Sequence, residues 1–160
     1  VEEATVKWND WFENFPGIKD FQQAARGAML TRRRKGLEKG IPGYVTTLLG
    51  RRGRLENNNP RLAYKAVSKI IQGGSADILK YKMVEIDRAL EADGDVDHLL
   101  FSVHDSVVFQ TRNGPEGDKV AMEILRIMED VQSDPFRLRV PFKADYGSGR
   151  NWSEATFGVD

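Results

Sequence analysis

Cysteine is absent from this chain of 160 residues, which excludes disulfides, thiolate zinc sites and a cysteine nucleophile. The chain also lacks any apolar run near the roughly 18 residues that a membrane-spanning helix needs. Its N-terminus is acidic and polar and does not resemble a signal peptide. We therefore expect a reducing compartment and no membrane partner. Because the chain begins with Val1 rather than Met, we also expect a processed or excised chain.

Net charge is a further absence, since 24 Lys and Arg residues balance 24 Asp and Glu residues. The charges are nevertheless unevenly distributed. Residues 30–82 contain 13 basic and 3 acidic side chains, whereas residues 83–135 contain 4 basic and 13 acidic ones. A strongly basic half favours a polyanion partner such as nucleic acid. The alternative is that long, solvated helices simply carry charged faces.

Helical periodicity marks the N-terminal region. Over residues 4–26, aromatic side chains form a stripe that is typical of a core or of an interface; they are Trp8, Trp11, Phe12 and Phe15. Pro16 interrupts the pattern, so we predict two helices that meet at a turn. The basic, glycine-rich residues 32–42 predict a mobile connection, either solvated or facing nucleic acid.

The next segments predict a hairpin and a long helix. Residues 44–49 have strand character, and a glycine- and arginine-rich turn leads back through Leu55. Asn59 and Pro60 form a helix-start signal, with Asn59 as the N-cap. The helix is predicted over residues 60–92. Two consecutive glycines in its interior, Gly73 and Gly74, indicate either a close approach of another backbone or of nucleic acid, or a bend.

Two apolar runs then flank the triplet His104-Asp105-Ser106. Such runs predict the two strands of a β-hairpin over residues 98–112, with Asp105 at its tip. A helix is predicted at 115–131 and a further strand at 138–145, whose Pro141 favours a sheet edge. The fold class is therefore α+β, with an antiparallel sheet of about three strands and long helices packed on one face.

A carboxylate at a hairpin tip contributes little to a core and is well placed to hold a metal ion. Mg²⁺ is a hard ion that takes oxygen ligands and keeps several waters, so few carboxylates suffice. The triplet is not a Ser-His-Asp triad, because residues adjacent on a tight turn cannot align nucleophile, base and orienting acid. Taken alone, a polar triplet between strands is most often only a turn.

Three segments, in this order and spacing, resemble the C-terminal palm region of family A DNA polymerases, the bacterial DNA polymerase I type. They are Gly43–Arg52, Gln72–Lys80 and the hairpin around Asp105. The resemblance covers about Trp11 to Ala155. It implies a palm segment over residues 44–160, comprising the helix 60–92 along the minor groove, the hairpin 98–112, and a closing strand and tail. Residues 1–43 then form a helical segment that follows the fingers helix, with a basic linker.

The resemblance also implies site residues. Asp105 binds metal, and His104 lies near the primer terminus. Gln72 reads the minor groove, where an amide reaches acceptors present on every base pair. The remaining implied DNA-binding residues, Arg51, Arg52 and Arg54, either contact phosphate or form structural ion pairs. Ser106 departs from the family pattern, which has Glu there, and this favours a phage-like source.

By this resemblance the chain is part of a DNA-directed DNA polymerase that uses two Mg²⁺ ions. Its partners are primer–template DNA, deoxynucleoside triphosphates and the remaining polymerase segment. That segment carries the first catalytic Asp and the fingers Lys, neither of which occurs here, so the fragment alone is predicted to be inactive. We expect cytoplasmic location, in a bacterium or a phage-infected host. The alternative is a non-catalytic module that binds duplex DNA and keeps the palm fold.

Overall fold

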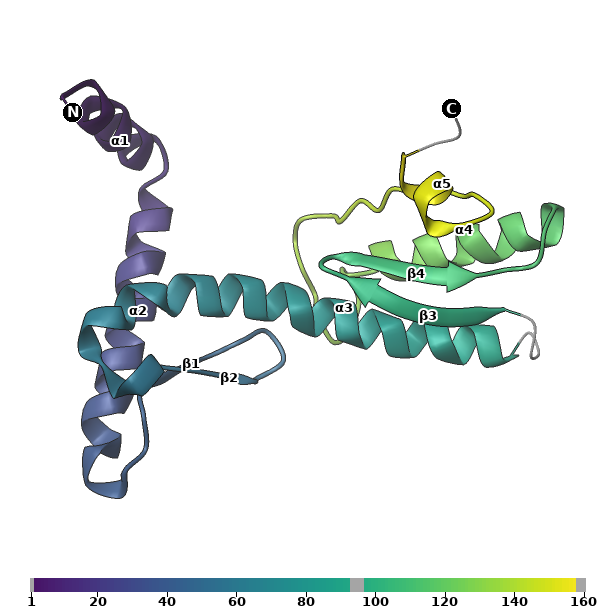
Figure 1. Ribbon diagram of the computed structural model, residues 1–160. Coiled ribbons are helices and arrows are strands. Elements are labelled where there is room, and N and C mark those ends of the chain that lie inside the picture. Colours follow the sequence, from purple (N-terminus) through teal and green to yellow (C-terminus); the bar gives the residue numbers. More distant parts are fainter. Residues whose placement is uncertain (1, 93–96, 158–160) are drawn as a thin grey trace. The chain divides into compact units, whose positions relative to one another are not determined.

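The computed structural model describes residues 2–92 and 97–157 and shows a chain of helices with two short β-hairpins (Figure 1). The chain divides into two compact units, residues 1–74 and 75–160, and the division falls inside helix α3. None of the described helices is both long enough and apolar enough to cross a membrane. Each unit has its own hydrophobic cluster and its own hairpin, so each is described separately.

The N-terminal helices are α1 (Glu2–Asn14) and α2 (Pro16–Gly36), and the predicted break between them is confirmed. Phe15 has an extended φ of −128°, and Pro16 occupies the first turn of α2. A proline fixes its own φ and disfavours helical geometry in the residue before it, while being tolerated at the start of a helix. The sequence therefore ends one helix and begins the next at the same place.

The predicted mobile connection at residues 32–42 is wrong over its first half. Helix α2 continues to Gly36, and a 3₁₀ turn, η1 (Leu37–Lys39), follows directly. Arg32 Nη1 donates to the carbonyl of Tyr44 (3.1 Å), and Arg33 Nε donates to the carbonyl of Asn58 (2.8 Å). These hydrogen bonds, together with the favourable position of basic side chains near a helix C-terminus, order a segment whose composition suggested a loop.

The first hairpin joins β1 (Tyr44–Thr46) to β2 (Arg52–Arg54) as predicted, with antiparallel pairing of Val45 to Gly53. Val45 points into the cluster of the first unit and is 2% exposed. That cluster joins α2, the hairpin and the start of α3; its buried members are Ala25, Met29, Val45, Leu55, Ala63 and Ala66. Val45 therefore anchors the strands of this hairpin to the cluster. Leu55, which directly follows β2, adds a second buried side chain.

The long helix begins as predicted but with a tighter first part. Asn59 Oδ1 accepts from Arg61 N (3.0 Å), and Pro60 opens the 3₁₀ helix η3 (Pro60–Lys65). Just before it lies the short 3₁₀ turn η2 (Glu56–Asn58), and α3 (Ala66–Ala92) follows. The predicted helix end at residues 93–95 lies outside the described residues. Helix η3 supplies buried Ala63 to the first cluster, and Ala66 of α3 completes it.

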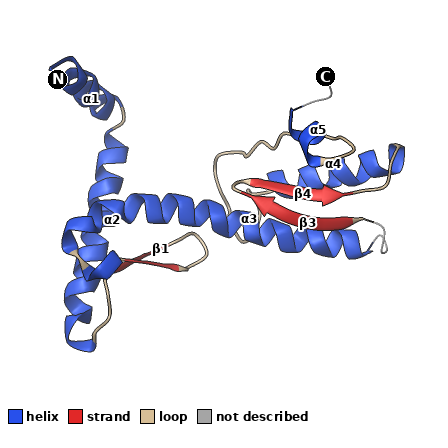
Figure 2. Cartoon of the chain, in the orientation of Figure 1, coloured by secondary structure: helices blue, strands red, loops and turns tan. Residues whose placement is uncertain are grey.

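The second unit is built on the hairpin of β3 (His98–Val103) and β4 (Ser106–Gln110), which confirms the predicted hairpin (Figure 2). One face packs on α3 and on α4 (Pro115–Glu129). Ile86, Leu90 and Ile124 form the buried centre of this cluster. The hairpin contributes partly buried side chains to it, namely Leu99, Val107 and Phe109. Residues two apart on a strand share a face, which places these side chains together.

The predicted strand at 138–145 is wrong, because these residues form no regular secondary structure. Its backbone donors are used elsewhere: Leu138 N donates to the carbonyl of Val131 (2.9 Å) and Ala144 N donates to a carboxylate oxygen of Glu129 (3.1 Å). Pro141 has no donor to offer. The described residues therefore form two separate two-stranded antiparallel sheets instead of one sheet of about three strands, while the mixed helix and strand class is confirmed.

The remaining C-terminal residues pack on the second unit in two places. Phe136 and Val131 are buried with Ile78 of α3, and Phe136 meets Tyr81 edge to face at 5.1 Å between ring centroids. The short helix α5 (Trp152–Phe157) brings Trp152 to 5.7 Å from the ring of Phe101 on β3. By register, Phe101 lies on the opposite face of the hairpin from Leu99, so α5 contacts the face that α3 and α4 leave uncovered.

Candidate functional site

Asp105 lies at the tip of the β3–β4 hairpin, in a two-residue turn with His104. Val103 and Ser106 are the last paired residues, and His104 has a φ of 56°. Positive φ at the first turn position matches the twist of the flanking strands, which is why two-residue hairpins use such turns. The side chains of His104, Asp105 and Ser106 are all exposed. Within the described part of the chain the carboxylate of Asp105 forms no ion pair.

The base of the same hairpin is closed by a buried ion pair between Asp97 and Arg112. Arg112 donates to the Asp97 carboxylate from its backbone N (2.8 Å), from Nε (3.1 Å) and from Nη2 (2.6 Å). The Asp97 side chain is 0% exposed and that of Arg112 is 32% exposed. The hydrogen bonds from the Arg112 side chain hold the pKa of Asp97 below its ordinary value of 3.8, although burial acts in the opposite direction. This pair joins the residues that flank the two strands.

The donor set at the hairpin tip fits a hard divalent cation, since it offers the exposed carboxylate oxygens of Asp105 and the exposed hydroxyl of Ser106. It does not make a complete site. Among residues 2–92 and 97–157, no three His, Asp or Glu side chains lie close enough to hold a metal ion together. A metal ion bound at Asp105 would therefore need further oxygen donors from outside this group of described residues.

Gln72 lies on α3, in the first unit, with its side chain exposed. The next residue, Gly73, touches the first hairpin: a Cβ at Gly73 would stand 2.5 Å from Cγ2 of Thr47. Arg51 Nη2 donates to the carbonyl of Gly73 (2.8 Å). The close approach at Gly73 is thus made by side chains of the hairpin and not by another backbone, which was one of the predicted alternatives.

The three arginines of the first hairpin do not share one face. By register, Tyr44 pairs with Arg54 and Thr46 with Arg52, so these four side chains point to the same, exposed side of the hairpin. Arg51 belongs to the other side, where it reaches α3. The structure therefore brings Arg52 and Arg54 together as an outward pair and separates them from Arg51, which holds the hairpin to the helix beside Gln72.

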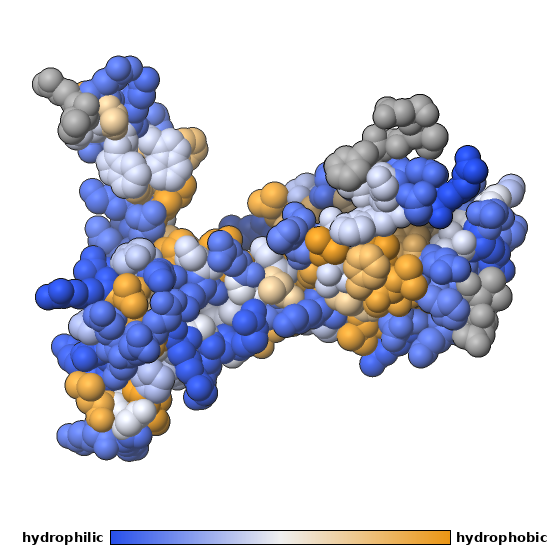
Figure 3. Space-filling view, viewed as in Figure 1, coloured by the Kyte–Doolittle hydropathy of each residue, from blue (hydrophilic) through white to orange (hydrophobic). Residues whose placement is uncertain are grey.

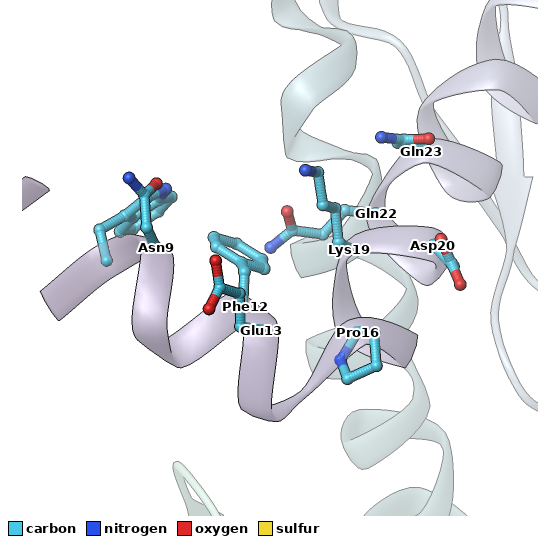
Figure 4. A pocket seen from close by; sticks show the side chains of 9 residues that line it. Asn9, Phe12, Glu13, Pro16, Lys19, Asp20, Gln22 and Gln23 are labelled. Carbon is cyan, nitrogen blue, oxygen red and sulfur yellow. The ribbon is translucent and has the colours of Figure 1, made fainter. Parts of the chain in front are cut away.

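A shallow groove of about 590 Å³ lies between α1 and α2, lined mainly by polar side chains (Figure 4). Phe12 faces it, flanked by Glu13 of α1 and by Lys19 and Gln22 of α2. Along α1 the aromatic rings stack edge to face, Trp8 to Phe12 at 4.9 Å and Trp11 to Phe12 at 5.0 Å. The predicted stripe exists, but it remains largely exposed, with Trp8 62% accessible.

Comparison with known proteins identifies the family. The model of "DNA polymerase family A" matches residues 1–154. The chain belongs to DNA polymerase family A. DNA polymerase I of Streptococcus pneumoniae is 33% identical over 161 residues, and that of Bacillus caldotenax is 34% identical over 162 residues. Each alignment covers 96% of this chain but 17% of the relative, so the chain spans about a sixth of the length of these family A polymerases.

A solved structure of the same family has the same fold. It is the POL domain of Pol1 from Mycobacterium smegmatis in complex with DNA primer-template and dNTP. The match has a TM-score of 0.74 and 28% identity, and it covers 96% of this chain and 26% of that chain. The sequence interpretation of this chain as a family A polymerase segment is therefore confirmed.

Two interactions in this family A chain were not predicted from the sequence: an ion pair and a set of cation–π contacts. The Asp97–Arg112 pair joins residues 15 apart, and charges at both ends of a predicted hairpin are the signal that could have found it. Tyr44 is the second: the guanidinium groups of Arg32 and Arg52 each lie 4.7 Å from its ring centroid. Arg52 pairs with Thr46, and Tyr44 lies two residues before Thr46. Tyr44 and Arg52 are therefore diagonal neighbours across the hairpin, and this contact can be predicted once the hairpin register is known.

Surface hydropathy differs between the two hairpins. Figure 3 shows hydrophobic side chains at the surface over β3 and β4, where Leu100 is 50% and Phe101 is 42% exposed. Leu100 is left out of the strand pairing by an irregularity between Leu99 and Phe101. The first hairpin presents arginines instead, so an apolar surface and a cationic surface belong to different units.

Proposed function

We propose that this chain is part of a DNA-directed DNA polymerase, which adds deoxynucleotides to a primer under the direction of a template. The observation that carries the proposal is Asp105: an exposed, unpaired carboxylate on a two-residue turn, in a chain that the family A model matches over residues 1–154. A structural role does not require an acid there, because the hairpin is already stabilised by its inner face and by the Asp97–Arg112 pair.

Asp105 is proposed as a ligand of Mg²⁺ in a two-metal site. When bound, such ions lower the pKa of the primer 3′-hydroxyl and stabilise the leaving pyrophosphate. The chain's contribution is to hold a negative oxygen at a fixed point, since a two-residue turn leaves the Asp105 backbone little freedom. His104, beside it on the turn, is proposed to lie near the primer terminus. The second carboxylate of the site comes from polymerase sequence outside this chain.

Duplex recognition is proposed for the first unit. The exposed amide of Gln72 has a donor and an acceptor, which suits the minor-groove acceptors shared by all base pairs. Arg52 and Arg54 point away from the core and are proposed to contact DNA phosphates. Arg51 is proposed to support this surface from behind through its hydrogen bond to Gly73. Residues 44–160 would then form the palm segment of the enzyme.

The partners follow from this assignment. Primer–template DNA and deoxynucleoside triphosphates are the substrates, and the fingers lysine that binds the triphosphate is supplied by the remaining polymerase segment. The exposed aromatic side of α1, with Trp8 and Trp11, is proposed to pack against that segment, because large apolar side chains gathered on one helix face are typical of an interface. The proposed place of action is the cytosol of a bacterium or of a phage-infected cell.

Reconstituted primer extension tests the proposal. This chain is mixed with the upstream part of a family A polymerase, primer–template DNA, dNTPs and Mg²⁺, and the products are compared with those of either part alone. Extension is expected from the pair only, and Asp105→Ala is expected to abolish it. Asp118→Ala is the matched control, because Asp118 is also an exposed acid of the second unit but lies on α4.

Two outcomes would contradict the polymerase assignment. The first is that the pair gains no extension activity over its parts. The second is that the pair binds duplex DNA but Asp105→Ala and Asp118→Ala behave alike; the chain would then be a duplex-binding module in which the hairpin acid is only a turn residue.

A further inference from the structure

The outward face of the first hairpin is a cationic surface organised around one aromatic ring. Tyr44 is half-buried, and the guanidinium carbons of Arg32 and Arg52 both lie 4.7 Å from its ring centroid. Arg32 comes from α2 and also donates to the carbonyl of Tyr44. Arg54 is the cross-strand partner of Tyr44. Two guanidinium groups therefore lie against one ring, and Arg54 adds a third arginine on the same face of the hairpin.

Other basic side chains of the same unit have acidic partners, which these three arginines lack among the described residues. Lys65 and Lys69 both bind Glu56, at 2.9 and 3.3 Å. In the described part of the chain no carboxylate lies within ion-pair distance of Arg32, Arg52 or Arg54. Like charges held close together repel one another, and an anion that binds among them relieves the repulsion. The surface thus has the charge of a site for an anionic ligand.

The Tyr44 ring orients the guanidinium groups that stack on it, in addition to bringing them close together. A guanidinium group that stacks on an aromatic face keeps its donors in its own plane, where they remain free to bind phosphate. Arg52 is exposed on a strand only three residues long, and without a stacking partner its long side chain would sample many rotamers. Stacking reduces the conformational entropy that Arg52 loses when it binds.

We propose that the Tyr44 ring, Arg32, Arg52 and Arg54 form a binding subsite for backbone phosphates of duplex DNA, in which Tyr44 is a positioning residue for Arg52. This subsite rests on the proposed polymerase function, which supplies DNA as the ligand. It assigns to Tyr44 and Arg32 a role in DNA binding that differs from that of Arg51, which faces α3.

The salt dependence of duplex binding tests this subsite. The full chain is titrated with a fluorescent blunt duplex, without Mg²⁺ or nucleotides, and anisotropy gives the affinity at several NaCl concentrations. Each lost phosphate contact reduces the slope of log K against log salt by about 0.9. Arg52→Gln is expected to cause this loss. Tyr44→Leu is expected to cause the same loss although it changes no charge, and Tyr44→Phe, which keeps the ring, is expected to retain the wild-type slope.

A double variant separates positioning from general structural damage. Because Tyr44 acts through Arg52, Tyr44→Leu combined with Arg52→Gln should bind no more weakly than Arg52→Gln alone. Arg26→Gln is the charge-matched control, since Arg26 is an exposed arginine of α2. Far-ultraviolet circular dichroism and thermal unfolding check that each variant folds. Should Tyr44→Leu not fold, the comparison of Arg52→Gln with Arg26→Gln, both exposed substitutions, still decides whether the subsite exists.

Several results would overturn the subsite: a wild-type slope in folded Tyr44→Leu, additive losses in the double variant, an equal slope loss in Arg26→Gln and Arg52→Gln, or no duplex binding by the unaltered chain. The assay contains no metal and measures no extension. Unchanged slopes in variants that bind duplex therefore reject the subsite alone, whereas failure of the Asp105→Ala test rejects the catalytic assignment alone.

Discussion

The two hairpins of this chain are stabilised in opposite ways. The first has strands of three residues and a five-residue connection, Thr47–Arg51, in which Gly50 has a φ of 84°. Its stability depends on neighbours, through buried Val45 and the Arg51 hydrogen bond to α3. The second has strands of six and five residues and a two-residue turn, and its base is closed by Asp97 and Arg112. The side chains at its tip are exposed, and in the described residues the carboxylate of Asp105 forms no ion pair.

This difference indicates a division of labour. A short hairpin that is fixed along its inner face can present a whole outer face, as Arg52 and Arg54 do, which suits contact with an extended ligand. A longer hairpin that is fixed at its base and along one face can present a single residue at its tip, as Asp105 does, which suits a point of chemistry. Substitutions that should affect one function and spare the other test this comparison.

The largest effect is expected at the tip of the second hairpin. Asp105→Asn removes the charge of a metal ligand and is expected to lower kcat of the reconstituted polymerase by at least about 10³-fold, since metal ions supply several kcal/mol of transition-state stabilisation. Duplex affinity and the melting temperature should stay unchanged, because the Asp105 carboxylate is exposed and has no ion-pair partner among the described residues. Steady-state extension and anisotropy measure the two properties. Equal losses of turnover and duplex affinity would mean that DNA binding and catalysis are not separated between the two hairpins.

Loss of the Asp97–Arg112 ion pair at the base of the second hairpin should have the next largest effect, on the free energy of unfolding. Asp97→Asn leaves the Arg112 guanidinium with a neutral partner and is expected to lower the free energy of unfolding by about 3 kcal/mol. Urea unfolding of the wild type and the variant gives this difference, with the exposed Glu116→Gln as a control that should change little.

The same substitution predicts a pH dependence with a definite sign. The pKa of Asp97 is held below its ordinary value of 3.8 by the Arg112 hydrogen bonds. A lowered pKa means that the folded state binds the proton less readily than the unfolded state. The stabilisation is therefore fully present above about pH 4 and is lost as the pH falls through the lower, folded-state pKa. An Asp97→Asn variant whose deficit is as large at pH 2 as at pH 7 would contradict this account.

The contact between α3 and the first hairpin predicts a smaller, position-specific effect. At Gly73 an added Cβ would lie 2.5 Å from Thr47 Cγ2, whereas at Gly74 it would lie 3.7 Å from Leu48 Cβ. Gly73→Ala is expected to destabilise the chain by roughly 1–3 kcal/mol through overpacking. Gly74→Ala is expected to be neutral or to stabilise it by up to about 1 kcal/mol through helix propensity. Urea unfolding of both variants measures this difference, and equal values would show that the hairpin does not press on the helix.

The smallest effect is expected at Gln72. Gln72→Ala removes an exposed amide and should leave the unfolding free energy unchanged. If that amide binds the minor groove, the variant loses about 1 kcal/mol of duplex affinity, roughly fivefold, which is the net value of one hydrogen bond. Anisotropy with the wild type and Gln72→Glu, of similar size, provides the measurement. Wild-type affinity in Gln72→Ala would limit duplex contact to the arginines.

Local chemistry in the sequence determined much of this chain. Pro16 ends one helix and begins another, Asn59 caps the next, and alternating apolar residues around His104-Asp105 form a hairpin; each follows from backbone geometry or from side-chain period within a few residues. Three motifs, namely Gly43–Arg52, Gln72–Lys80 and the hairpin around Asp105, indicated family A. The position of Asp105 at the hairpin tip was predictable for the same reason, since register follows from the apolar pattern.

Only the tertiary structure decided the remainder. Residues 32–36 are helical because Arg32 and Arg33 find carbonyl acceptors on Tyr44 and Asn58, far along the chain. Residues 138–145 alternate like a strand but pair with none, because Val131 and Glu129 accept their backbone hydrogen bonds. Likewise, three neighbouring arginines look equivalent in the sequence, and only packing against α3 separates Arg51 from Arg52 and Arg54. Long-range partners cannot be read from local pattern, because a donor bonds to whichever acceptor the fold brings near.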